Sequence, residues 1–359
     1  MLRRLLAPAA LALALTVTAC TQGSPATGDA NGKDLAIAFL MPCSTCADRF
    51  ESKDKPYFEE AVKAIDPAIK VIAGNAQGDA AVQLQQAESA LTNGAKVIVV
   101  SPFTAEAGAA IVAKADAAGA KVVAYDGAIE GAVPAAYVSF QNQKVGELQG
   151  QYLLDKLPPG ATVAMINGDI TSAPGREFKA GAHKILDPAF ASGRLKLGYE
   201  SDTPGFDPAK GQAAMEQGLT KLGDDVQGVI APNDGLANAV ITALTARKLN
   251  GKVLVTGQDA TDAGLGSIMA GNQSMTVYKS IRAEATAAAK IAVALAKGDT
   301  AGATQLTTST VDNGTGKVPA VLLDPVAVTR DTIADVVIKD GYTTKDKICA
   351  GLAADKCGL

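Results

Sequence analysis

Three consecutive segments decide the fold: Lys96-Val-Ile-Val-Val100, the alanine-rich Ala105–Ala118 and Lys121-Val-Val-Ala-Tyr125. The two short β-branched runs are typical of buried strands, and the longer segment between them is typical of a helix. A strand, a helix and a second strand in this order predict two parallel strands joined by a covering helix.

The same alternation continues in both directions along the chain. Further strands are predicted at Leu35–Leu40, Lys70–Ala73, Ala136–Ser139, Thr162–Ile166, Leu195–Glu200, Gly228–Ile230, Lys252–Thr256 and Met275–Tyr278. Further helices are predicted at Asp79–Asn93, Gln143–Lys156, Arg176–Leu186, Pro208–Lys221, Leu236–Lys248 and Ile281–Lys297. These are too many units for one open sheet, so we expect an α/β fold of two Rossmann-like lobes, each a doubly wound parallel sheet, joined by a multi-strand hinge.

The chain order assigns residues to these lobes. We expect residues 34–138 with 277–312 in an N-terminal lobe and 139–276 with 313–345 in a C-terminal lobe, followed by a tail at 346–359 that carries a cysteine pair. In open α/β sheets, ligands bind beyond the carboxyl ends of the strands. Two lobes that face each other at those ends would enclose a ligand between them.

The first residues indicate export. Arg3 and Arg4 precede the apolar run Leu5–Ala19, which is too short for a membrane span and has the pattern of a secretory signal at residues 1–19. Val17-Thr-Ala-Cys20 resembles a bacterial lipobox, which predicts lipidation of Cys20 and a flexible tether at 20–33. The alternative is an ordinary signal peptide cut near Ala19. We expect an extracytoplasmic monomer that meets the outer face of the cell membrane only through its lipid.

Composition limits the possible functions. Loss of Arg3 and Arg4 with the signal leaves 31 of the 33 basic residues against 37 acidic ones, a net charge near −6 that argues against a nucleic-acid partner. A single histidine, His183, argues against Ser-His-Asp and histidine-metal chemistry. We therefore expect no metal, no cofactor and no catalytic residue.

Four further cysteines form two local pairs. Outside the cytoplasm, such pairs are more often disulfides than free thiols, so Cys43–Cys46 and Cys349–Cys357 are the expected bonds. A redox-active Cys-x-x-Cys motif and a four-cysteine zinc site remain the alternatives.

Polar residues follow most of the predicted strands. Their carboxylates, amides and cations suit sugar hydroxyls, which both donate and accept hydrogen bonds. Each residue alone could also be a helix cap or part of a charged surface. The polar candidates are Arg49, Asp126, Asn142, Asn233, Asp234, Gln258, Asp259 and Lys279, and the candidates to cover the apolar face of a sugar are Phe50, Phe103 and Phe206.

Five segments carry a family resemblance. They are Val122–Asp126, Tyr137–Gln149, Ala231-Pro-Asn-Asp234, Thr256-Gly-Gln-Asp259 and Met275-Thr-Val-Tyr-Lys279. In order and spacing they resemble the xylose-binding branch of the periplasmic sugar-binding proteins, the type I class that also includes ribose and galactose binders. The resemblance covers about residues 34–340. It implies a sugar site at the positions of Arg49, Asp126, Asn142, Asn233, Asp234, Asp259 and Lys279, and the permease of an ABC importer as partner.

The chain also departs from that family. Gly127 and Lys179 stand where arginines are frequent, although Arg176 lies nearby, and Phe206 occupies a region that is rich in tryptophan. Lysine lacks the bidentate fork of arginine, so the ligand is less certain than the class. The resemblance implies D-xylose, with glucose, arabinose or another monosaccharide as alternatives. Three other functions share this kind of ligand: a sensor subunit for a membrane receptor or kinase, a sugar-modifying enzyme and a sugar-responsive repressor.

Overall fold

A computed structural model describes residues 35–47, 49–353 and 357–358. The signal, the tether and the predicted lipidation site at Cys20 lie outside these residues. Within the described ranges, no helix combines the length and the apolar composition that a membrane crossing requires.

The first sheet contains seven strands in the order β11-β12-β5-β4-β3-β1-β2. Its pairs are parallel except that of β11 with β12. Both faces of the sheet are buried, which explains the nearly continuous apolar character of its strands. The strands are β1 (Ala36–Met41), β2 (Lys70–Asn75), β3 (Ala95–Val100), β4 (Lys121–Tyr125), β5 (Ala136–Phe140), β11 (Ser309–Asp312) and β12 (Lys317–Leu323).

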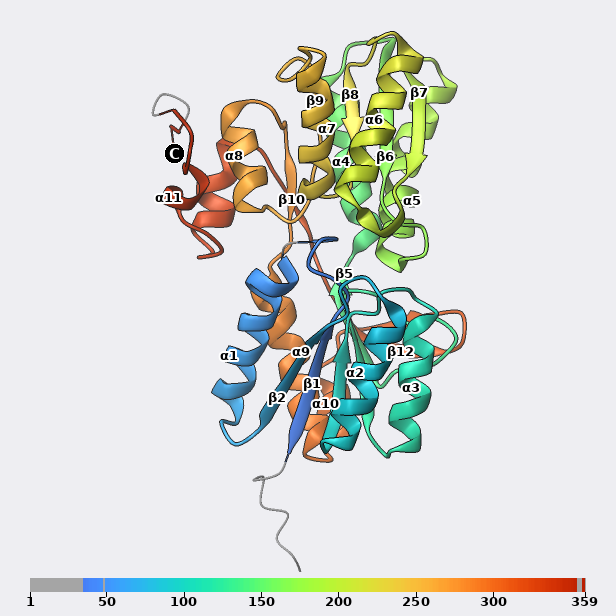
Figure 1. Cartoon of the computed structure of the whole chain (residues 1–359), viewed down its shortest axis with the longest axis vertical. Coiled ribbons are helices and arrows are strands. Elements are labelled where there is room, and N and C mark those ends of the chain that lie inside the picture. Colours follow the sequence, from blue (N-terminus) through green and yellow to red (C-terminus); the bar gives the residue numbers. More distant parts are fainter. Residues whose placement is uncertain (1–34, 48, 354–356, 359) are drawn as a thin grey trace, which may run out of the picture. The chain divides into compact units, whose positions relative to one another are not determined.

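Helices cover the two faces of this sheet. On one face, α1 (Lys55–Ile65) and α9 (Ile281–Ala296) pack on alternate strand residues such as Ile37 and Phe39. On the other face, α2 (Ala80–Thr92) and α3 (Ala107–Ala117) pack on Ala38 and Leu40 (Figure 1). The short η2 (Phe50–Asp54) precedes α1, and α10 (Thr300–Gln305) follows α9.

The second sheet has four parallel strands in the order β7-β6-β8-β9. One face packs on α4 and α5, and the other packs on α6 and α7. Its strands are β6 (Ala161–Asn167), β7 (Leu195–Asp202), β8 (Gly228–Ile230) and β9 (Leu254–Val255), and its helices are α4 (Asn142–Lys156), α5 (Ala173–Ala191), α6 (Pro208–Leu222) and α7 (Asp234–Ala246), with η3 (Pro204–Phe206) between β7 and α6.

A small antiparallel pair joins the remaining elements. β10 (Thr276–Tyr278) pairs with β13 (Val326–Val328), and a buried cluster beside them includes residues of α8 (Asp262–Ala270), η5 (Ala334–Ile338) and α11 (Lys345–Ile348). The short η4 (Arg330–Thr332) follows β13. The chain passes between the two sheet systems after β5, after β10 and after β12, so several strands connect the lobes.

The predicted fold class is confirmed: parallel sheets, covered on both faces, form two α/β lobes. Residues 317–323, which we expected in the C-terminal lobe, form β12 and pair with β5 in the first sheet. Residues 136–140 form one strand of that sheet, so β5 crosses the expected boundary at residue 138. The partner of a strand is set by contacts distant in sequence, which a local pattern does not contain.

Candidate functional site

A pocket lies at the carboxyl ends of strands from both lobes. Its walls come from the segments that follow β1, β3, β4, β6, β7, β8, β9 and β10. Of the residues predicted from the sequence, nine line it: Arg49, Phe50, Phe103, Asp126, Phe206, Asn233, Gln258, Asp259 and Lys279. The edge at which parallel strands end therefore collects these residues from segments far apart in the chain.

Arg49 is a buried cation held by three carboxylates. Its Nε and Nη2 donate to the two oxygens of Asp54 at 2.9 and 2.6 Å, and Nη2 also donates to Oε2 of Glu284 at 2.6 Å. Nη1 donates to Oδ1 of Asp126 at 3.0 Å. Burial lowers the pKa of Arg49, but the charges of Asp126, Asp54 and Glu284 outweigh it and hold this pKa well above its ordinary value. The guanidinium is thus fixed, with its direction set before any ligand arrives.

Asp126 connects this cation to a second one. Its Oδ1 also accepts a hydrogen bond from Nζ of Lys279 at 3.4 Å. Burial would raise the pKa of Asp126, but the positive charges of Arg49 and Lys279 keep that pKa below its ordinary value. Asp126 is therefore ionised at neutral pH and aligns both cations.

Asp259 has unused hydrogen-bonding capacity. Its Oδ1 lies 3.8 Å from Nζ of Lys279, and this buried oxygen has no hydrogen-bond partner. Oε1 of the neighbouring Gln258 is likewise buried without a partner. Burial raises the pKa of Asp259, against the opposing charges of Lys279 and Arg49. A buried acceptor without a donor costs about 1–3 kcal/mol, so these two oxygens favour a ligand that donates hydrogen bonds.

Three pocket residues have strained backbone angles. Asp126, Phe206 and Asp259 have φ angles of 57°, 51° and 90°, in the region that residues other than glycine seldom adopt. The carbonyl of Asp126 accepts hydrogen bonds from the hydroxyls of Tyr137 and Ser139, and that of Asp259 accepts one from the hydroxyl of Tyr342. These bonds hold the two carboxylates in a strained arrangement that points to function.

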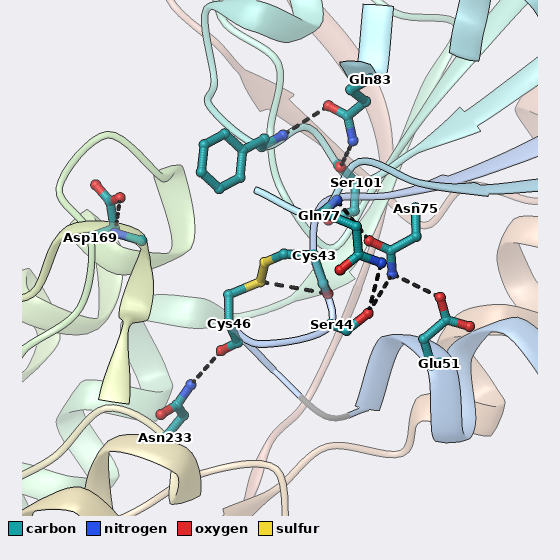
Figure 2. The surroundings of a disulfide bond; sticks show 12 residues. Cys43, Ser44, Cys46, Glu51, Asn75, Gln77, Gln83, Ser101, Asp169 and Asn233 are labelled. Atoms are coloured by element: carbon teal, nitrogen blue, oxygen red, sulfur yellow. Dashed lines mark hydrogen bonds between the residues drawn. A yellow bond between two sulfur atoms is a disulfide. The ribbon is translucent and has the colours of Figure 1, made fainter. Parts of the chain in front are cut away.

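Aromatic rings form much of the remaining wall. Phe50 and Phe103 come from the first lobe, while Phe206 and Phe178 come from the second. Gln83 fixes the segment before Phe103, because its side chain donates to the carbonyl of Ser101 and accepts from the amide of Phe103 (Figure 2). Flat apolar rings beside polar groups suit a sugar, which has C–H faces and a hydroxyl rim.

Four predicted ligand-binding residues lie outside the pocket wall. Asn142 donates to the hydroxyl of Ser139, Arg176 pairs with Glu130, and Lys179 pairs with Glu200 and Asp202. Asp234 is fully buried and accepts hydrogen bonds from Thr261, Gln273 and Thr276. Burial raises the pKa of Asp234 to about 7, although its donors oppose the rise. It braces the segment that carries Gln258 and Asp259.

Sequence reasoning missed several residues of the site. Asp54 and Glu284, which hold Arg49, lie in a charged run and in the predicted helix Ile281–Lys297, and neither was a candidate site residue. Asp169 lines the pocket and accepts hydrogen bonds from Thr171 and the amide of Gly205. Its position two residues after a buried strand was a usable signal.

The structure pairs Cys43 with Cys46 and Cys349 with Cys357, as predicted. Among the described residues, no group of three or more His, Cys, Asp or Glu side chains has the geometry to hold a metal ion.

The model of the periplasmic binding protein domain family matches residues 37–300. The D-xylose-binding periplasmic proteins of Haemophilus influenzae and Escherichia coli are 37% and 34% identical to this chain, over 89% and 93% of it and 93% and 98% of their own lengths. A carbohydrate transporter solute-binding protein from Chloroflexus aurantiacus, solved with D-glucose, superposes with a TM-score of 0.78 at 29% identity, over 88% of this chain and 97% of that one.

Proposed function

Because the chain belongs to the periplasmic binding protein family, we propose that it captures a neutral monosaccharide outside the cytoplasm and delivers it to the permease of an ABC-type sugar importer. The mature protein begins at a lipidated Cys20 under this proposal.

The charge balance at the pocket supports a neutral ligand. Both cations at the wall, Arg49 and Lys279, already contact carboxylates, whereas the buried oxygens of Gln258 and Asp259 have no donor. A sugar acid or a sugar phosphate would add acceptors where donors are needed, and its charge would lie near Asp126, Asp169 and Asp259. A polyhydroxylated neutral ligand supplies donors without adding charge, and this observation carries the proposal.

D-Xylose is the first candidate ligand. The two curated relatives described above are named for that sugar, while the structural relative holds D-glucose. Glucose, arabinose and other monosaccharides therefore remain the alternatives within the same proposal.

Binding is coupled to closure of the lobes. Arg49, Asp126 and Phe103 belong to the first lobe, and Asp259 and Phe206 to the second, so a ligand that contacts both sets stabilises the closed state. Nothing in this mechanism requires a covalent step, which agrees with relatives that are named as binding proteins.

Isothermal titration calorimetry of the purified mature protein tests the proposal. We expect saturable binding of one or more of D-xylose, D-glucose and L-arabinose, and recovery of the sugar unchanged. Absence of heat with every pentose and hexose at millimolar concentration would refute it. Turnover of the sugar would instead favour an enzyme.

A further inference from the structure

Residues 42–47 and 49, which lie between β1 and η2, contribute to the pocket wall. Pro42, Cys46, Ala47 and Arg49 all line the pocket, and the Cys43–Cys46 disulfide closes the middle of the loop (Figure 2). Cys43 is buried, with an exposed fraction of 1%. The disulfide therefore joins a pocket residue, Cys46, to a buried residue behind the wall, Cys43.

One end of this loop is anchored to the first lobe. The hydroxyl of Ser44 accepts hydrogen bonds from Nδ2 of Asn75 and Nε2 of Gln77, both at 3.1 Å. Nδ2 of Asn75 also donates to Oε1 of Glu51 at 2.8 Å (Figure 2). The disulfide extends this anchoring from Cys43 and Ser44 to Cys46.

The other end of the loop meets the second lobe. The carbonyl of Cys46 accepts a hydrogen bond of 3.1 Å from Nδ2 of Asn233, a pocket residue. Oδ1 of Asn233 accepts from the amide of Leu236 and caps α7, so the direction of its Nδ2 is fixed. A direct bond between the lobes thus ends on a disulfide-bonded residue.

The entropy that a disulfide removes from the unfolded chain does not distinguish Cys43–Cys46 from the other disulfide. The Cys43–Cys46 bond spans a sequence separation of 3, and the Cys349–Cys357 bond spans 8. A longer closed segment restricts the unfolded chain more, so Cys349–Cys357 has the larger expected effect on global stability. Neither Cys349 nor Cys357 lines the pocket, whereas Cys46 does.

We propose that the Cys43–Cys46 disulfide is a positioning element of the sugar site, which holds the Cys46 carbonyl for Asn233, and that its reduction by a dithiol weakens sugar binding. This inference rests on the proposed function. In the reaction, a dithiol thiolate attacks one cystine sulfur and the S–S bond breaks, which gives a mixed disulfide. The second thiol of the reductant then displaces the remaining cysteine. Cys43 and Cys46 end as protonated thiols and the dithiol ends as a cyclic disulfide.

Two double variants form the test, and the control is matched in chemistry. Wild type, C43S/C46S and C349S/C357S are titrated with D-xylose, D-glucose and L-arabinose, and dissociation is followed by stopped flow. We expect C43S/C46S to bind the tightest of these sugars on the order of tenfold more weakly, mainly through faster dissociation, because the loop must then be ordered on binding. C349S/C357S keeps wild-type affinity within about twofold, even where its melting temperature falls.

Reduction provides a second route that needs no new side chain at the pocket. In C349S/C357S, the Cys43–Cys46 bond is the remaining disulfide of the described residues, so treatment with dithiothreitol reduces it selectively. Sugar affinity should fall as in C43S/C46S, and reoxidation should restore it. This route remains decisive if C43S/C46S does not fold.

A double-mutant comparison tests the path through Asn233. N233D keeps a capping oxygen for α7 but removes the donor to Cys46. Its loss of affinity and the loss from reduction should not add, because both break the same contact. Full additivity would contradict this path.

The outcomes separate the two proposals. Failure of oxidised wild type to bind any sugar overturns the proposed function and this inference together. If wild type binds sugar and C43S/C46S binds it with the same affinity and the same dissociation rate, this inference alone is overturned. Equal losses of affinity in both double variants also overturn it, because they would indicate a general effect of disulfides on the fold.

Discussion

Replacement of Asp259 by asparagine removes the negative charge from the pocket with little change in shape. Asparagine tolerates positive φ better than alanine, so D259N keeps the backbone at its φ of 90° with the least added strain. Oδ1 of Asp259 is buried without a hydrogen-bond partner, and we expect this oxygen to accept from a sugar hydroxyl. A hydrogen bond to a charged group contributes about 1.5–3 kcal/mol, and one between neutral groups contributes about half as much. The loss of charge should therefore weaken binding on the order of tenfold.

Calorimetric titration of D259N and wild type at neutral pH measures this effect. E88Q is the control, because Glu88 forms an exposed ion pair with Lys114 on the outer helices of the first lobe, and its affinity should match wild type. Unchanged affinity in D259N, with both proteins folded, would refute the role of this carboxylate.

Three further predictions concern a buried charge, a contact between lobes and the membrane. Burial raises the pKa of Glu284 to about 8, although the charge of Arg49 opposes the rise. The folded protein therefore binds this proton more tightly than the unfolded chain does. The stability that Glu284 contributes is present below about pH 4.5 and is lost as the pH rises towards 8. Urea unfolding should show that the free energy of unfolding of wild type falls over this pH range, and that it depends less on pH in E284Q. The same pH dependence in both proteins would contradict this prediction. E130Q breaks the exposed ion pair of Glu130 with Arg176, which joins the lobes; titration should show about 1.5- to 5-fold weaker sugar binding than E88Q, and no difference from E88Q would exclude a contribution to closure. C20A should move the protein from the membrane fraction to the soluble fraction on immunoblots, and an unchanged distribution would argue against lipidation.

The strands of the first lobe could be predicted because their signal is local. β4 was predicted at its observed bounds, Lys121–Tyr125, from its β-branched composition alone. Helix α1 was not predicted, and Lys55–Ile65 was left unassigned between the first two predicted strands. The pairing of β12 with β5 joins residues distant in the chain, and no periodicity records such a contact.

Some features of the site could likewise be predicted from the sequence and others could not. Polar residues at strand ends could be placed together, because parallel strands end at one edge of a sheet. The sequence could not show which of two adjacent residues faces the pocket: Asn233 does, while Asp234 turns inward to Thr261 and Thr276. Glu284 was missed because its helix is otherwise rich in alanine, and only the tertiary fold brings it to Arg49.

A crystal structure of the mature protein with its bound sugar tests the central claim most directly. We expect one monosaccharide in contact with Arg49, Asp126, Asp259 and Lys279, with hydroxyls donating to Oδ1 of Asp259 and Oε1 of Gln258. A sugar bound elsewhere on the protein, or a pocket that stays empty at saturating sugar, would contradict the account.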